Sequence, residues 1–152
     1  MSAPDKTEEE DEQSWLAAST HPLVLIVDDD DAIRGALRDL LEDAGFDTLG
    51  ARHGLEALNI LAALGTAPTF ILLDLMMPVM DGWAFCDVRR RSPAFAEVPI
   101  IAISAVEISD SNRPAGIDAF LEKPIDVDKF ARLAVRLSGR KSSSVWPSSL
   151  LH

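Results

Sequence analysis

The sequence has 152 residues, enough for one domain with a buried core, and with 47% hydrophobic and 26% charged residues it has the composition of a globular protein. A formal net charge of −11 argues against nonspecific binding to nucleic acids, and no apolar run reaches the length of a membrane span. The single cysteine, Cys86, excludes an internal disulfide framework, and the first residues lack the pattern of a secretory signal, so we expect a cytoplasmic protein.

The two ends of the chain differ in composition from its middle. Residues 1–22 carry six acidic residues against one lysine, with a single apolar cluster around Trp15, and we expect a solvated, flexible tail. Residues 138–152 are rich in serine and contain no acidic residue, so we expect a second flexible tail, in which Trp146 and its apolar neighbours could form a docking peptide. The folded domain is then expected over residues 23–137, with no second domain on either side.

Between these ends, short apolar runs alternate with segments of helical periodicity. Leu23–Val27 is apolar throughout, as in a strand buried on both faces of a parallel sheet. The spacing then becomes helical from Asp31, which can cap a helix, to Gly45, which can end it. Further strands are expected at 46–50, Phe70–Asp74, Ile100–Ser104 and Ala119–Glu122, and further helices at Gly54–Leu64, 82–91 and 126–137. This alternation predicts right-handed βαβ units and an α/β fold, a three-layer αβα sandwich with a five-stranded parallel sheet.

Polar side chains follow three of the expected strands. Asp28 and Asp29 follow the first strand, Asp74 ends the third, and Ser104 ends the fourth. The carboxyl ends of parallel strands meet at one edge of the sheet, where open α/β sheets bind their ligands. Taken singly, such residues are often only helix caps, turn formers or solvated side chains. Their joint placement indicates a functional site.

The chemistry of this set favours phosphoryl transfer. Converging carboxylates repel one another, and a hard divalent cation such as Mg²⁺, which binds oxygen ligands and bridges to phosphate, removes that cost. An aspartate beside the ion, here Asp74, can accept a phosphoryl group. The hydroxyl of Ser104 and the ammonium group of Lys123 can hold the remaining phosphoryl oxygens.

Four motifs in order resemble those of the receiver domain of two-component response regulators. They are VLIVDD at 24–29, LLDLMMPVMDG at 72–82, ISA at 103–105 and FLEKP at 120–124, and the resemblance covers about residues 23–137. It implies a flavodoxin-like sheet with the strand order 2-1-3-4-5. It also implies a signalling domain rather than an ordinary enzyme, with at most Mg²⁺-dependent self-phosphorylation from a phosphodonor and slow self-dephosphorylation.

By this resemblance, Asp74 is the phosphoacceptor. Mg²⁺ is the implied cofactor, and its ligands are Asp28, Asp29, Asp74 and the backbone carbonyl of Met76.

The resemblance also assigns a switch and partners. Ser104 takes the position of the switch hydroxyl, Phe120 that of the rotating aromatic residue, and Lys123 that of the phosphate-contacting lysine, with a cis bond to Pro124. The implied phosphodonor is a sensor histidine kinase or a histidine phosphotransfer protein, and the downstream partner is an unidentified protein. Neither nucleic acid nor a membrane is an expected direct partner.

One segment departs from the family pattern. Between Ser104 and Lys123 the chain is shorter than is usual in the family by about three residues, close to one helical turn. Pro114 and Gly116 would also interrupt a helix there. We therefore expect a short or irregular fourth helix, which puts the family's usual dimer and output face in doubt.

Other functions remain open at the level of sequence. A stand-alone phosphoacceptor is the first interpretation, and a pseudo-receiver, an interaction module that phosphate does not switch, is the alternative. An aspartate-dependent phosphohydrolase usually has a second acid two residues after the nucleophile, where this chain has Met76. A dinucleotide-binding domain is excluded, because four aspartates stand where its first turn needs glycines.

Overall fold

The computed structural model describes residues 21–109, 111 and 113–138. Our expectations for residues 1–20 and 139–152 lie outside this range. The described part forms one five-stranded parallel sheet in the order β2-β1-β3-β4-β5, which confirms the expected topology. The strands are β1 (Leu23–Val27), β2 (Asp47–Ala51), β3 (Phe70–Asp74), β4 (Ile100–Ser104) and β5 (Ala119–Glu122). The helices are α2 (Asp31–Asp43), α3 (Gly54–Leu64), α4 (Gly82–Arg90) and α5 (Val127–Ser138).

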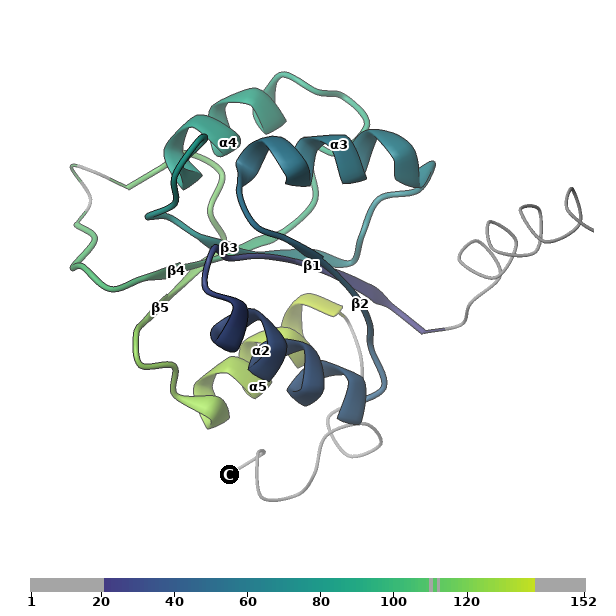
Figure 1. The fold of residues 1–152 in the computed structure, drawn as a ribbon, viewed down its shortest axis with the longest axis vertical. Coiled ribbons are helices and arrows are strands. Elements are labelled where there is room, and N and C mark those ends of the chain that lie inside the picture. Colours follow the sequence, from purple (N-terminus) through teal and green to yellow (C-terminus); the bar gives the residue numbers. More distant parts are fainter. Residues whose placement is uncertain (1–20, 110, 112, 139–152) are drawn as a thin grey trace, which may run out of the picture.

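The helices cover the sheet on both faces, as a three-layer sandwich requires. Helices α3 and α4 lie on one face and helices α2 and α5 on the other (Figure 1). Successive side chains of a strand point to opposite faces, so each buried strand supplies both cores. In β1, for example, Val24 and Ile26 pack in the core with α2 and α5. Leu25 and Val27 pack in the core with α3 and α4.

The boundaries of the elements follow the expectations closely, with small shifts. Helix α2 is capped by Asp30, whose side chain accepts hydrogen bonds from the amides of residues 32 and 33, so the expectation of an Asp31 cap was wrong by one residue. Gly45 has φ +92° after this helix, which only glycine adopts readily, and this confirms its role in ending the helix. Strand β2 begins one residue later than expected, at Asp47.

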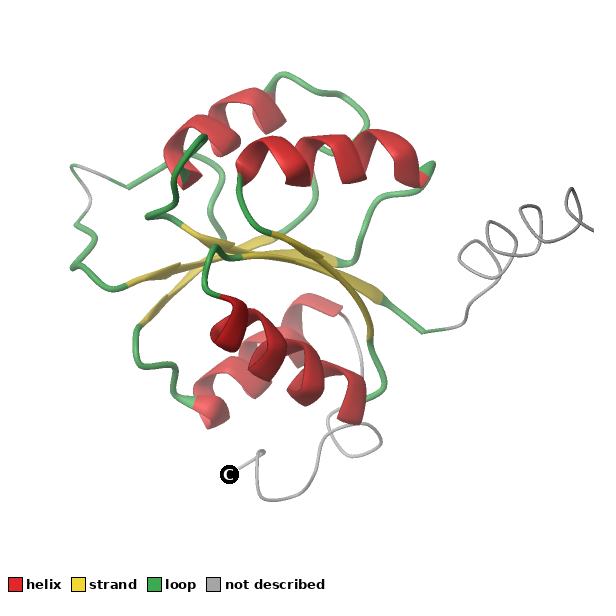
Figure 2. Ribbon diagram, in the orientation of Figure 1, coloured by secondary structure: helices red, strands yellow, loops and turns green. Residues whose placement is uncertain are grey.

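The connection from β4 to β5 contains no helix among its described residues, as Figure 2 shows. This confirms the expectation for the shortened segment. Polar contacts from neighbouring elements hold the connection instead: the buried guanidinium of Arg89 on α4 donates to the carbonyls of Val98 and Gly116. Asp118 accepts a hydrogen bond from the amide of Ile100 at 2.8 Å.

Across the described ranges, none of the helices has both the length and the apolar character needed to cross a membrane.

Candidate functional site

Three carboxylates converge at the carboxyl ends of β1 and β3. Asp28 directly follows β1 and is fully buried, Asp74 is the last residue of β3 and only 2% exposed, and Asp29 is exposed. One oxygen from each lies within 4.8 Å of the others. The structure thus brings together the three acidic residues that the sequence indicated.

Backbone contacts fix the buried Asp28. Its amide donates to the carbonyl of Ala51 at 3.0 Å, which extends the pairing of β1 with β2 by one residue. Its Oδ1 accepts the amide of Asp30 at 2.9 Å, and Arg34 on α2 donates to its carbonyl at 2.8 Å. The remaining oxygen, Oδ2, is buried without a hydrogen-bond partner, and its ion pair with the Lys123 ammonium is long, at 3.5 Å. A buried carboxylate oxygen in this state is costly, and a cation at the site would satisfy it.

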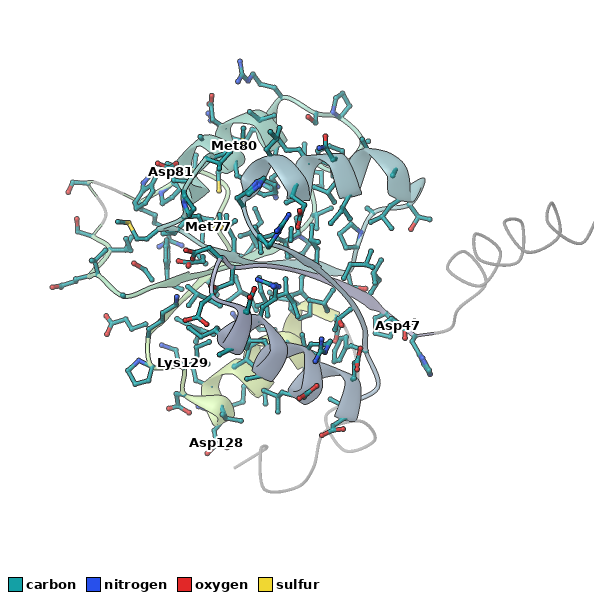
Figure 3. All side chains as sticks on the ribbon, viewed as in Figure 1. Asp47, Met77, Met80, Asp81, Asp128 and Lys129 are labelled. Carbon is teal, nitrogen blue, oxygen red and sulfur yellow. The ribbon has the colours of Figure 1, made fainter. Side chains whose placement is uncertain are left out.

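The loop after β3 holds Asp74 from the other side. The amide of Met76 donates to Asp74 Oδ1 at 3.0 Å, and the amide of Gly82 donates to the carbonyl of Leu75 at 3.0 Å. A Cβ on Gly82 would lie 2.7 Å from the Cα of Leu75, so only glycine allows α4 to begin this close to the strand. Figure 3 labels two other residues of this loop, Met77 and Met80, on the side of the sheet that carries α3 and α4.

Lys123 brings a positive charge to the cluster from the end of β5. Its Nζ lies 3.3 Å from Asp74 Oδ2 and 3.5 Å from Asp28 Oδ2. Its amide donates to the carbonyl of Ser104 at 2.9 Å, and its peptide bond to Pro124 is cis, as expected.

The pKa values reflect this crowding. Burial raises the pKa of Asp74 to about 6, and the charge of Asp28 adds to the effect, while the Met76 amide and Lys123 act in the opposite direction. Partial burial acts to lower the pKa of Lys123, but the carboxylates of Asp28 and Asp74 hold it above its ordinary value. A buried carboxyl of raised pKa at the end of a strand is typical of functional sites.

The donor set fits Mg²⁺. Three carboxylates can each offer an oxygen, the buried Oδ2 of Asp28 has no hydrogen-bond partner, and the exposed Asp29 leaves the site open to water. Mg²⁺ prefers oxygen ligands and keeps several waters, which suits a partly open carboxylate cluster.

Of the residues expected to act as a switch, Ser104 lies at the same edge of the sheet, whereas Phe120 is paired with Ala102, two residues before that edge. Ser104 ends β4, next to β3, and its hydroxyl accepts the amide of Val106 at 3.1 Å. Phe120 on β5 is half-buried, and the guanidinium carbon of Arg113 lies 4.6 Å from its ring centroid.

Two residues that contact the site or the expected switch, Arg34 and Arg113, were not found from the sequence. Arg34 follows Asp31 by three residues, and this helical spacing could have suggested their ion pair but not the contact of Arg34 with the carbonyl of Asp28. Arg113 lies in a segment without periodicity, so no sequence signal pointed to its position over Phe120.

The comparison with protein families decides the assignment. The model of the response regulator receiver domain matches residues 24–134. The chain belongs to this family. Its receiver domain therefore accounts for nearly all the residues that the structure describes.

Individual proteins and solved structures agree with this assignment. The chain is 33% identical over 137 residues to the DNA-binding dual master transcriptional regulator RpaA of Synechocystis, a match that covers 86% of this chain but only 56% of RpaA. It is 32% identical over 110 residues to the polar-differentiation response regulator DivK of Brucella anthropi, covering 70% of this chain and 88% of DivK. The solved receiver domain of the Francisella response regulator 1452 is 30% identical with a TM-score of 0.70, covering 78% of this chain and 98% of that one.

Proposed function

We propose that this receiver domain is a phosphoacceptor of a two-component phosphorelay, phosphorylated on Asp74 with Mg²⁺ bound. The observation that carries the proposal is the convergence of Asp28, Asp29 and Asp74 within 4.8 Å, with the Lys123 ammonium 3.3 Å from Asp74. This arrangement combines a nucleophilic carboxylate, a set of metal ligands and a fixed cation for phosphate.

The transfer is a displacement at phosphorus. A carboxylate oxygen of Asp74 forms the new bond to phosphorus while the bond to the donor breaks, with the bonding electrons leaving on the donor atom. For a phosphohistidine donor whose other ring nitrogen carries a proton, the imidazole nitrogen is the leaving group, and the products are an acyl phosphate and a neutral histidine. Asp74 supplies the nucleophile in its ionised form.

The other residues serve to hold the transferred group. Mg²⁺, when bound by Asp28, Asp29, Asp74 and the carbonyl of Met76, would neutralise charge on the phosphoryl oxygens. Lys123 supplies a cation already directed at Asp74.

The Ser104 hydroxyl, whose oxygen accepts the amide of Val106, would donate its own hydrogen to a phosphoryl oxygen, and Phe120 would then change position as the aromatic residue of the switch. The half-burial of Phe120 at present supports a residue with room to move.

The partners in this proposal are proteins. A sensor histidine kinase or a histidine phosphotransfer protein donates the phosphoryl group, and a protein not yet identified binds the phosphorylated form. The free, buried Cys86 agrees with a reducing, cytoplasmic setting.

The test is phosphorylation by a small donor. The protein is incubated with an acyl phosphate or phosphoramidate and Mg²⁺, and intact mass and peptide mapping follow the reaction. We expect one phosphoryl group, on Asp74, that is absent from Asp74→Asn and strongly reduced in EDTA. A mass gain that persists in Asp74→Asn would contradict the assignment. No mass gain with any donor would instead favour the pseudo-receiver, an interaction module that phosphate does not switch.

A further inference from the structure

An apolar groove on the α2 and α5 face lies outside the acidic site. It encloses about 590 Å³, within the size range of ligand-binding pockets. One wall is formed by Ile33, Ala36 and Leu40 of α2, and the other is the start of α5 and the loop before it, with Ile125 and Val127. Its floor is continuous with the core, yet its rim is open to solvent, and Val127 is 41% exposed.

The chain itself supplies a segment with matching chemistry. Residues 139–152 follow α5 directly and contain Trp146 beside Val145 and Pro147, in a sequence otherwise rich in serine. We propose that this segment folds back along α5 and seats Trp146 in the groove of the same molecule.

The geometry allows this return. Helices α2 and α5 follow parallel strands and so run in the same direction, with their last turns at the same edge of the sheet. The groove extends from the first turn of α5 along α2 as far as Leu40. The 12 residues of α5 span about 18 Å. The eight residues from Ser138 to Trp146 can reach about 26 Å when extended, and Pro147 favours an extended conformation in the residue before it.

Charge favours this segment over the other end of the chain. Arg140 and Lys141 would emerge beside the last turn of α2, which contains Glu42 and Asp43 and no basic residue. Residues 139–152 carry no acidic residue, whereas residues 1–20, which hold the competing Trp15, carry six. An acidic segment would be repelled by a body in which acidic residues outnumber basic ones, nineteen to eleven over 21–138.

Tethering makes the contact feasible even when it is weak. A short flexible connection raises the effective concentration of the attached segment to about the millimolar range. Seating an indole ring removes a large apolar surface from water. The groove also begins at Lys123 and Pro124, so an occupied groove covers the surface beside the acidic site. Figure 3 labels Asp128 and Lys129 at the first turn of α5, directly after the groove residue Val127.

The experiment isolates the fluorescence of Trp146. In the full chain carrying Trp15→Phe and Trp83→Phe, we expect a blue-shifted emission and acrylamide quenching several-fold weaker than in a synthetic peptide of residues 139–152. Ala36→Glu places a charge in the groove and should restore peptide-like quenching. The matched control is Ala63→Glu, the same change at an exposed position of α3 on the opposite face, and it should leave the protection intact.

Several outcomes would overturn the proposal. Quenching of Trp146 equal to that of the free peptide excludes docking, and protection that rises with protein concentration assigns the groove to a second copy. A parallel sample keeps Trp15 as the sole tryptophan. If Trp15 is protected from quenching, and Ala36→Glu removes that protection, the groove is assigned to the other end of the chain. Should Ala36→Glu fail to fold, Val127→Asp charges the opposite wall and is expected to give the same release.

Discussion

The ammonium nitrogen of Lys123 lies 3.3 Å from a carboxylate oxygen of Asp74, although 49 positions separate the two residues. The same nitrogen lies 3.5 Å from Asp28. Asp28 follows β1, Asp74 ends β3 and Lys123 follows β5, so the cluster forms only when the sheet from β1 to β5 has formed. The stability of the fold and the charge state of the site are therefore coupled.

This coupling predicts how stability changes with pH when Mg²⁺ is absent. Because burial raises the pKa of Asp74 from 3.8 to about 6, the folded state binds a proton that the unfolded state has released between these values. The contribution of Asp74 to stability is thus highest at low pH, and it is lost as the pH rises from about 4 through 6, by roughly 2–3 kcal/mol. Asp74→Asn keeps an oxygen for the Met76 amide and removes the titration. In EDTA, thermal melts should show the variant more stable than the unmutated protein at about pH 8, with a smaller difference at about pH 5.

The control for this measurement is Asp39→Asn, a neutralised carboxylate at an exposed position of α2. It should change the melting temperature little and equally at both pH values. If Asp74→Asn changes the melting temperature no more than Asp39→Asn does at either pH, the buried carboxylate does not oppose folding, and the predicted coupling of stability to the charge of the site is wrong.

Mg²⁺ should stabilise the folded protein by mass action. An ion that binds only the folded state contributes about 2.7 kcal/mol at a concentration one hundred times its dissociation constant. Asp29→Asn should weaken the stabilisation by Mg²⁺, because it removes one candidate ligand. Without metal, the fold should tolerate this substitution, because Asp29 is exposed. Melting curves over a Mg²⁺ series check the prediction, with Asp39→Asn again as the control. An equal Mg²⁺ shift in Asp29→Asn and Asp39→Asn would show that Asp29 does not bind the ion.

Two glycines offer a matched test of the loop that holds Asp74. A methyl group on Gly82 would lie 2.5 Å from Leu75 Cδ2 and 2.7 Å from Leu75 Cα, so Gly82→Ala must push α4 away from the strand end. We expect a loss of about 1–3 kcal/mol in the free energy of unfolding, as for other overpacked sites. A methyl group on Gly35, inside α2, would meet only Arg38 Nη2, at 3.8 Å. Gly35→Ala should therefore stabilise the protein by about 0.5–1 kcal/mol, because it removes a glycine from a helix.

Urea denaturation of both variants checks these signs. Both substitutions add the same atoms, so the comparison isolates the surroundings of each glycine. A neutral or stabilising Gly82→Ala would mean that the loop after β3 can move away at no cost.

The sequence predicted the fold best where every residue of a strand is buried. Every residue of β3 and β4 is buried, and an apolar run bounded by turn residues defined both strands to the residue. Phe46 shows the limit. Because it is an apolar residue directly after the expected end of a helix, the sequence placed it at the start of a strand, and its side chain does pack edge-to-face on Phe70, with 5.9 Å between ring centroids. Its amide instead bonds to the carbonyl of Leu41, and Phe46 belongs to the helix-ending turn.

The site was predictable in its acidic part and not in its surroundings. Four consecutive aspartates can each cap a helix, and only the path of the chain after β1 selects Asp30 for that role. The contacts of Arg89 and Arg113 depend on a connection without helical or strand periodicity. Such long-range contacts between a charged side chain and loop atoms leave no repeating pattern in a sequence.

The last prediction concerns the lifetime of the proposed phosphorylated state. Hydrolysis of an acyl phosphate needs a water held in line with phosphorus, and polar side chains usually position such a water. By family resemblance, the flanking positions here are Met76 and Val106, and both are apolar and exposed, at 53% and 47%. Neither can orient a water, so we expect the phosphorylated protein to persist for minutes or longer. Met76→Asn should shorten this lifetime, and each factor of ten corresponds to about 1.4 kcal/mol in the barrier, the size of one positioned hydrogen bond. Met76→Leu is the matched control, because it keeps the position apolar and should leave the lifetime unchanged. The measurement removes the donor and follows the decay of the phosphorylated mass in Mg²⁺. A half-life of seconds in the unmutated protein, or equal decay in Met76→Asn and Met76→Leu, would show that side chains at this position do not control the water.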